Sequence, residues 1–141
     1  MISYTNPVLP GTNPDPSVCR GADAFYLVTS SFSYFPGLPI YRSSTLFSWE
    51  LVGHGLTRPS QLDFARFAGK NEIFAPTIRY HRGRYYIVTT DVGGRGNFLI
   101  SATNPAGPWS DPLHIDQRLF DPSLLFDGDT VYYSRRGPRG I

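Results

Sequence analysis

The chain has 141 residues, of which 40% are hydrophobic and 15% aromatic, and it contains 14 Gly and 13 Pro. This composition is typical of a single β-rich domain with many turns, and it argues against a helical bundle and against a disordered chain. The formal net charge of +2 is too small to indicate a nucleic-acid partner or an acidic membrane surface, and one cysteine excludes an internal disulfide framework.

Four short strands are predicted in the first part of the chain, after an irregular lead-in over residues 1–12. They are expected at residues 17–20, 24–29, 40–43 and 49–52. The loop over residues 30–39 displays the aromatic side chains Phe32, Tyr34 and Phe35. Short apolar runs that are separated only by turn residues indicate strands joined by tight connections.

The stretch from residue 54 to residue 73 interrupts this pattern and is predicted to be a long loop. Its one helix-like segment, Leu62-Asp63-Phe64-Ala65-Arg66-Phe67, is short. Long loops in compact domains are usually functional or mobile, so this loop is a place to look for ligand contacts.

The strand pattern then restarts twice. In a second unit, strands are expected at residues 77–80, 84–90, 97–101 and 113–115, with Trp109 assigned to the fourth strand. In a third unit, strands are expected at residues 123–126 and 130–134. Repeats of four short strands indicate the blades of a β-propeller, so the predicted fold class is all-β.

The chain is predicted to supply about two and a half blades. Blade 1 is placed at about residues 13–53, blade 2 at about 74–116 and a partial blade 3 at about 120–141. Such a set cannot close a ring, and the third blade would leave an unpaired strand edge. We therefore expect a fragment of a longer polypeptide. The alternative is that two chains associate with each other.

Each unit opens with a related motif that ends in Pro followed by Ser or Thr. The motifs are Asn13-Pro14-Asp15-Pro16-Ser17, Phe74-Ala75-Pro76-Thr77 and Phe120-Asp121-Pro122-Ser123. Proline suits the first residue of a strand, because it fixes φ and lacks a backbone donor. Three strands are therefore expected to begin in the same way.

Asp15 and Asp121 hold equivalent places in the first and third motifs, and their carboxyl groups are expected to converge at one mouth of the propeller channel. Bringing two carboxylates together costs repulsion and desolvation, which a function would justify. Ala75 at the same place indicates that the turn itself does not require a carboxylate. The alternative is that Asp-Pro-Ser serves only as a turn and strand start.

The residues near these motifs suit a sugar ligand. Four aromatic residues are expected on or next to loops at the mouth, where flat rings pack against the C–H faces of a pyranose: Phe32, Tyr34, Phe35 and Phe74. Arg58, Gln61 and Asp63 could form hydrogen bonds with sugar hydroxyls. Aromatic residues in a propeller are more often part of the core between blades, so each ring alone indicates little.

Other chemistries find little support. The three histidines are scattered without the spacing of metal ligands, so no protein metal site is expected. Cys19 is expected on a strand without a partner base, as a small core residue. Gly93-Gly94-Arg95-Gly96 lacks the Lys-Ser/Thr of a phosphate-binding loop and is predicted to be a hairpin turn.

No transmembrane span is present, and the first residues lack the basic and apolar regions of a signal peptide. We therefore expect a cytoplasmic protein, or a secreted one if a leader was removed.

Several longer motifs strongly resemble those of family 43 glycoside hydrolases, and the likeness runs along the whole chain in the right order. The motifs span residues 6–11, 13–17, 35–41, 56–63, 75–80 and 121–124. Within this family, the chain looks most like the β-xylosidases that also act on α-L-arabinofuranosides.

The resemblance implies a five-bladed propeller that hydrolyses β-1,4-xylo-oligosaccharides from one end, with inversion, through three carboxylates. By the family's motif, Asp15 matches the general base that activates water. Asp121 matches the third carboxylate, which orients the general acid and raises its pKa by like-charge proximity.

The substrate contacts implied or expected are five residues: Phe32, Phe74, Ala75, Arg58 and Gln61. Phe32 and Phe74 match positions that line the sugar in the first subsite. The family usually has Trp at position 74, so Phe74 is a departure that weakens or reshapes the stacking.

The family's general acid is a Glu in a later blade. Glu50 is expected on an outer strand and Glu72 before blade 2, so neither matches. General acid catalysis is typically worth about 10²–10⁴-fold, so the segment alone is expected to hydrolyse little or nothing while the parent protein is active. The alternatives are a non-catalytic carbohydrate-binding or interaction propeller and an inactive truncated gene product.

No cofactor is expected, although a calcium ion sits in the central channel of some relatives. The expected partners are a small carbohydrate substrate, such as a xylo- or arabino-oligosaccharide, and the remaining blades of the parent chain. The sequence is also compatible with a homo-oligomer.

Overall fold

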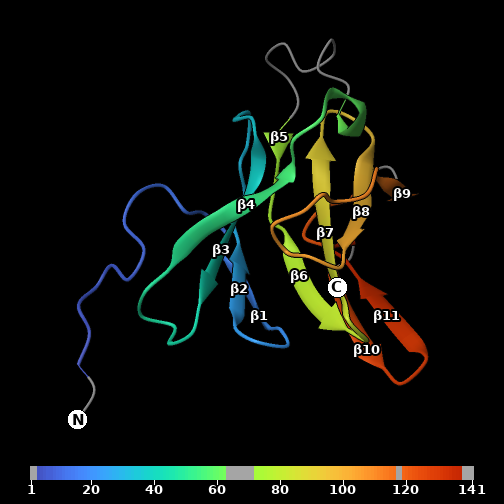
Figure 1. Cartoon of the computed structure of the whole chain (residues 1–141). Helices are drawn as coiled ribbons and strands as arrows, with labels where there is room; N and C mark the ends of the chain where they lie inside the picture. The colour runs from blue at the N-terminus through green and yellow to red at the C-terminus, as the bar shows by residue number, and fades with distance from the viewer. Residues whose placement is uncertain (1–2, 63–71, 117–118, 138–141) are drawn as a thin grey trace.

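The first sheet contains four antiparallel strands in sequence order (Figure 1). They are β1 (Ser17–Arg20), β2 (Phe25–Val28), β3 (Gly37–Ser43) and β4 (Glu50–Leu56). The computed structural model describes residues 3–62, 72–116 and 119–137. In this part of the chain, no helix is long and apolar enough to cross a membrane.

The ends of β3 and β4 correct the predicted boundaries. Gly37 pairs with Leu56, so β3 begins earlier and β4 ends later than expected, and the predicted long loop loses its first residues to a strand. A short 3₁₀ helix, η1 (Pro59–Gln61), follows β4. Of the helix-like segment predicted over residues 62–67, only Leu62 belongs to the described residues.

Gly53 explains how β4 can run so close to the second unit. A Cβ atom at this position would lie 2.7 Å from the backbone oxygen of Ala106. Real Cβ atoms do not approach another atom so closely, so only glycine allows the two backbones to meet here.

The second sheet has five strands: β5 (Glu72–Ile73), β6 (Thr77–His81), β7 (Arg84–Val92), β8 (Gly96–Ala102) and β9 (Leu113–Asp116). The third unit is a hairpin of two strands, β10 (Ser123–Asp127) and β11 (Thr130–Ser134). The predicted Gly-rich hairpin turn is confirmed, because Asp91 pairs with Gly96. Trp109 lies before β9 and not in a strand, and its buried indole N–H donates to the Pro105 oxygen at 3.2 Å.

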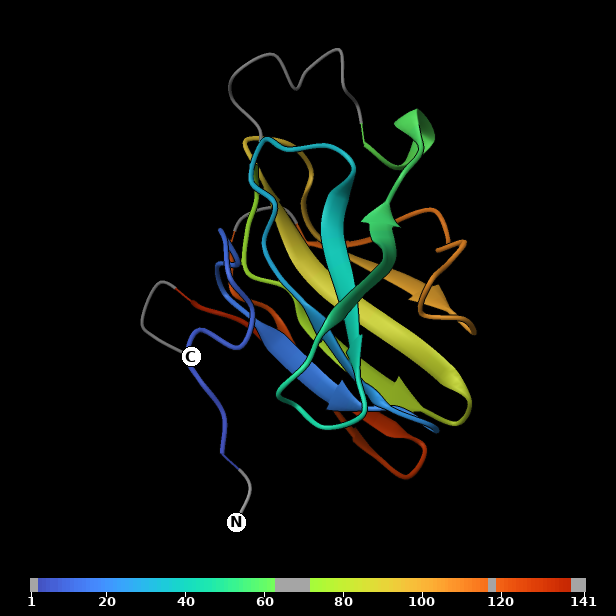
Figure 2. The same ribbon diagram turned by 60° about the vertical axis from the view of Figure 1, so that its left-hand side comes forward.

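Strand β6 contacts β1 on one side and β10 on the other, and the two ribbon views show this order (Figures 1 and 2). The Ile78 N–H donates to Ser17 Oγ at 3.1 Å, and Arg79 Nε donates to the Leu124 oxygen at 2.9 Å. Ser17 of the first motif therefore ties its unit to the next one.

The main core lies between the first and second sheets. Its buried side chains come from the strands of both sheets and from the segments beside them: Ala24, Tyr26, Val28, Leu38, Ile40, Leu56, Leu62, Ile73, Ile78, Tyr85, Ile87, Phe98, Ile100, Ala102 and Trp109. Cys19 packs against this cluster as expected, and burial raises the pKa of its thiol to about 11, against an opposing effect of Arg79.

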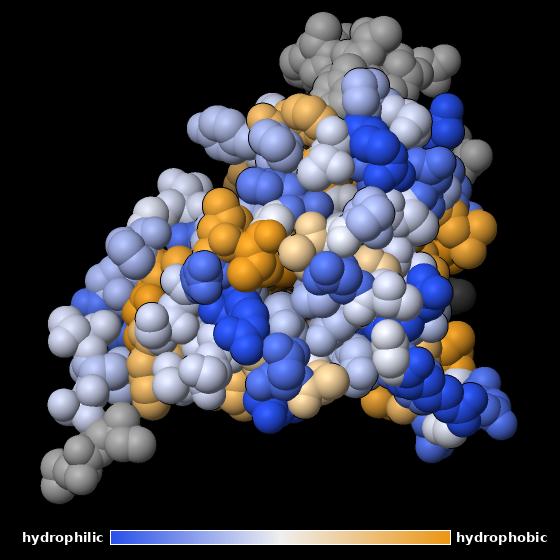
Figure 3. Space-filling view, viewed as in Figure 1, coloured by the Kyte–Doolittle hydropathy of each residue, from blue (hydrophilic) through white to orange (hydrophobic). Residues whose placement is uncertain are grey.

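Some large apolar side chains remain at the surface. Leu113 and Ile115 of β9 and Leu125 of β10 are exposed, and Figure 3 shows apolar patches at the β9 edge and over the β10–β11 hairpin.

A buried polar chain joins the second and third units. Thr90 Oγ1 donates to Asn97 Oδ1 at 2.6 Å, and Asn97 Nδ2 donates to the Tyr133 hydroxyl at 2.8 Å. Asn97 is fully buried. Because a buried polar group that loses its partner pays its full desolvation penalty, Asn97→Ala is expected to lower the free energy of unfolding of the full-length protein by about 1–3 kcal/mol.

Urea unfolding of the variant measures this loss. Tyr133→Phe is the matched comparison, because it removes only the hydroxyl that accepts from Asn97. The double variant should lose less than the sum of the two single losses. Strict additivity would show that the hydrogen bond does not couple the two units.

Candidate active site

Each of the three strand-start motifs is held by one backbone hydrogen bond at the same place, in which the motif accepts in the first and third units and donates in the second. In each unit, the bond joins the residue that precedes the motif's Asp or Ala to a residue at or just beyond the end of the unit's second strand. The pairs are Ser30 N–H to Pro14 O (3.0 Å), Phe74 N–H to Thr90 O (3.0 Å) and Arg136 N–H to Phe120 O (3.1 Å). Asp15, Ala75 and Asp121 therefore follow equivalent anchor points.

The backbone distinguishes the two carboxylates from the alanine. Asp15 has φ 51° and Asp121 has φ 59°, whereas Ala75 has no such positive φ. Phe32, on the loop after β2, has φ 45°. Positive φ is uncommon for residues other than glycine and is a genuine outlier for a bulky one, and such strain clusters at functional sites.

Asp15 is exposed in this chain, and one of its carboxylate oxygens is held. The Ser30 hydroxyl donates to Asp15 Oδ2 at 2.7 Å. Among the residues that the structure describes, Oδ1 makes no hydrogen bond. Asp15 thus has one fixed oxygen and one oxygen available to water. Sequence reasoning missed Ser30, although the parallel between Val28-Thr29-Ser30 and Val88-Thr89-Thr90 could have drawn attention to it.

An aromatic row connects the three units. Phe74 meets Phe32 edge to face, with ring centroids 5.9 Å apart, and meets Phe120 at 6.3 Å. The backbones of Phe32 and Ile73 are joined by two hydrogen bonds of 3.0 and 3.1 Å. Asp121 directly follows Phe120, and Ser30, whose hydroxyl binds Asp15, lies two residues before Phe32. The two predicted carboxylates are therefore carried by, or bonded to, segments that adjoin the aromatic row.

Gln61, expected to contact the sugar, is used differently. Its amide oxygen accepts from the Thr57 and Arg58 N–H groups, and its amide nitrogen donates to the oxygens of Gly55 and Ser110, at 2.9–3.1 Å. These four bonds exhaust the hydrogen-bonding capacity of a glutamine amide. In this structure, Gln61 braces η1 and has no bond left for a hydroxyl.

Arg58, also expected to contact the sugar, ties η1 to the segment before β9. It donates to the Trp109 oxygen at 3.0 Å and to Asp111 Oδ1 at 2.6 Å. Asp63 lies outside the described residues. Tyr34 and Phe35 are exposed, as expected for a loop that displays them.

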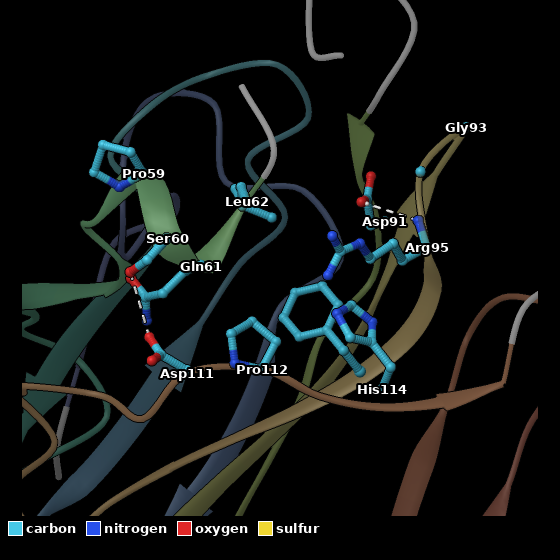
Figure 4. A pocket seen from close by; sticks show the side chains of 12 residues that line it. Pro59, Ser60, Gln61, Leu62, Asp91, Gly93, Arg95, Asp111, Pro112 and His114 are labelled. Atoms are coloured by element: carbon cyan, nitrogen blue, oxygen red, sulfur yellow. Dashed lines mark hydrogen bonds between the residues drawn. The ribbon is translucent and has the colours of Figure 1, made fainter. Parts of the chain in front are cut away.

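A polar cavity of about 390 Å³ lies beside η1 (Figure 4). Its lining comes from residues 59–62, from β7, β8 and the turn between them, and from residues 111–114: Pro59, Ser60, Gln61, Leu62, Asp91, Gly93, Gly94, Arg95, Phe98, Asp111, Pro112 and His114. Neither predicted catalytic carboxylate lines it.

The hydrogen bond of Asp91 and the pKa of His114, two titratable groups that line this cavity, both follow from their surroundings. Asp91 Oδ2 accepts from the Arg95 N–H at 3.2 Å and thereby closes the hairpin turn. Burial, followed by the positive charge of Arg95, lowers the pKa of His114, and Asp91 opposes this. His114 is therefore mostly neutral at pH 7 and does not add to the charge of the cavity.

Within the described ranges, no three His, Cys, Asp or Glu side chains gather as metal ligands would. The arrangement offers carboxylates, a hydroxyl and aromatic rings, which can transfer protons and hold an uncharged polar ligand.

The chain matches the family model described as glycosyl hydrolases family 43 over residues 4–140. It is 47% identical over 135 residues to the non-reducing end alpha-L-arabinofuranosidase BoGH43B of Bacteroides ovatus, covering 93% of this chain and 26% of that protein. It is 46% identical over 147 residues to a xylosidase/arabinosidase of Butyrivibrio fibrisolvens, covering 100% of this chain and 28% of that protein.

Solved structures show the same likeness. A Bacteroides ovatus xyloglucan PUL GH43B structure superposes with a TM-score of 0.86 at 41% identity, covering 97% of this chain and 30% of that chain. A xylan beta-1,4-xylosidase from Bacillus halodurans superposes with a TM-score of 0.81 at 42% identity, covering 90% of this chain and 26% of that chain.

The chain spans about a quarter of the length of the curated relatives that it matches. Together with the observed sheets, the comparisons confirm the predicted fold class: the chain supplies about two and a half blades of a five-bladed β-propeller.

Proposed function

Because this chain belongs to family 43 of the glycosyl hydrolases, we propose that the protein containing it is an exo-acting, inverting glycosidase of β-1,4-xylo-oligosaccharides. The observation that carries the proposal is the pair of strand-start carboxylates, Asp15 and Asp121, which share a positive φ that Ala75 lacks. The names of the matched relatives, xylosidases and arabinofuranosidases, support this substrate class.

We propose that Asp15 is the general base. An inverting site needs one carboxylate that takes a proton from water while the water attacks the anomeric carbon, on the face opposite the leaving oxygen. The free oxygen of Asp15 suits this step, because the other oxygen is held by Ser30. The proton passes from water to Asp15 as the new C–O bond forms.

Asp121 is proposed to act on the general acid and not on the water. A negative charge beside a carboxylic acid disfavours its ionised form, so the acid keeps the proton that the leaving oxygen needs. The acid itself is proposed to be a Glu of a later blade, since Glu50 is exposed on β4 and Glu72 lies on β5. The segment alone is therefore proposed to be inactive.

The aromatic row is proposed to hold the sugar. Phe74→Ala is expected to raise KM about tenfold, because a ring that covers an apolar sugar face contributes about 1.5–3 kcal/mol of burial. Phe74→Trp, which enlarges the ring surface, should lower KM or leave it unchanged. Steady-state kinetics on an aryl xyloside gives both values.

Phe126→Ala is the matched control for Phe74→Ala. Phe126 also lies in an aromatic cluster, with ring centroids 4.6 Å from His81 and 5.0 Å from Tyr86, but it lies at the far end of β10 from Asp121. Its removal should leave KM within about twofold. Equal changes in KM for both variants would remove the proposed sugar contact.

The proposal is tested by turnover of p-nitrophenyl β-D-xyloside and p-nitrophenyl α-L-arabinofuranoside by the full-length protein, beside residues 1–141 alone. Hydrolysis by the full-length protein and none by the segment is the expected result. A full-length protein that binds xylose without hydrolysis would indicate a binding propeller.

The proposed reaction needs only carboxyl groups and water, so we propose no cofactor. The cytoplasmic location stays a prediction.

A further inference from the structure

Ser30 holds the carboxylate of Asp15 through a contact that its own backbone does not need. The 2.7 Å distance from Ser30 Oγ to Asp15 Oδ2 is that of a strong O–H···O bond. The Ser30 N–H separately donates to the Pro14 oxygen at 3.0 Å. The backbone is thus anchored without the hydroxyl, which is left to act on the carboxylate.

The serine end of this contact is buried and the carboxylate end is exposed. Ser30 is 3% exposed, while Asp15 is exposed at the strand start. A carboxylate on the surface can rotate, and a buried hydroxyl that holds one of its oxygens limits that rotation. Because proton transfer depends on the alignment of base, water and anomeric carbon, this restriction favours the reactive geometry.

The other two units show that the repeat does not require this contact. The second unit has Thr90 at the place of Ser30 and Ala75 at the place of Asp15, and the Thr90 hydroxyl donates to Asn97 Oδ1 at 2.6 Å instead. The third unit has Arg136 at this place, and its guanidinium lies 5.0 Å from the centre of the Phe120 ring. Among the three repeats, the hydroxyl–carboxylate pair therefore occurs only at Asp15.

We propose that Ser30 is a positioning residue for the general base: its hydroxyl fixes Asp15 Oδ2 so that Oδ1 faces the attacking water. The proposal rests on the proposed function of Asp15. It predicts that loss of the hydroxyl slows the chemical step and leaves substrate binding almost unchanged.

The test uses Ser30→Ala and Ser30→Thr in the full-length protein, with p-nitrophenyl β-D-xyloside as substrate. Ser30→Ala should lower kcat about tenfold and keep KM within about twofold. Ser30→Thr retains a hydroxyl, and threonine occupies the equivalent place in the second unit, so it should restore most of kcat. Thermal unfolding of each variant identifies any loss of folding.

Ser31→Ala is the matched control. Ser31 is the neighbouring buried serine, 5% exposed, and its Oγ has no hydrogen-bond partner among the described residues. Its replacement should leave kcat close to that of the unaltered protein. A kcat for Ser30→Ala equal to that for Ser31→Ala would overturn the proposal.

A double-mutant cycle separates positioning from a general structural effect. If Ser30 acts through Asp15, Ser30→Ala should have no further effect on the residual kcat of Asp15→Ala. A further tenfold loss in that background would show that Ser30 acts elsewhere. If Asp15→Ala itself keeps full activity, the proposed function of Asp15 fails, whatever Ser30 does.

Discussion

Replacing Asp15 by Ala in the full-length protein is expected to lower kcat/KM for p-nitrophenyl β-D-xyloside by about 10²–10⁴-fold, the usual contribution of a general base. The reason is that no other group is placed to accept the proton of the attacking water in the proposed mechanism. Because Asp15 is exposed in this chain and its only described side-chain bond is to Ser30, the folded state should tolerate the change.

Asp129→Ala is the control for this result. Asp129 is a carboxylate on the third hairpin whose side chain is 88% exposed and pairs with Arg82. Surface ion pairs contribute little to stability, so this variant should keep both its fold and its activity. If Asp15→Ala retains more than a tenth of the activity, Asp15 is not the base.

Asp121→Asn is expected to reduce kcat by about 10²-fold, near the lower end of the contribution of general acid catalysis. Removing the negative charge beside the general acid lowers the pKa of that acid, because a like charge no longer opposes its ionisation. The acid then loses its proton at a lower pH, so the alkaline limb of the kcat profile should move to lower pH. The pH dependence of kcat measures this shift.

The acid limb of the same profile serves as the internal control. It reports the general base, which the Asp121→Asn exchange does not remove, so it should move less than the alkaline limb. An alkaline limb that stays in place would show that Asp121 does not set the protonation of the acid, even if kcat falls.

Most strands could be predicted, because their signals are local. Proline at the strand starts and short aromatic or β-branched runs mark β1, β2, β6, β7, β10 and β11 near their observed bounds. The ends of β3 and β4 could not be predicted, since glycine has low strand propensity. Gly53 and Gly55 belong to β4 because other segments pack against them: a Cβ on Gly55 would lie 3.1 Å from Ile100 and 3.2 Å from Leu38.

The candidate site divides in the same way. The repeat itself points to Asp15 and Asp121, because a comparison between units reveals a carboxylate that the turn does not require. Gln61 could not be assigned from sequence, since a polar residue in a loop has the same pattern whether it contacts a ligand or the backbone. Only the structure shows that its amide is fully bonded.

The anomeric configuration of the first product tests the proposed mechanism most directly. ¹H NMR can follow xylose as it is released from p-nitrophenyl β-D-xyloside by the full-length protein, before mutarotation mixes the anomers. A water activated by Asp15 attacks the face opposite the leaving group, so α-xylose should appear first. Initial release of β-xylose would contradict inversion and would assign the carboxylates to a retaining mechanism with a covalent intermediate.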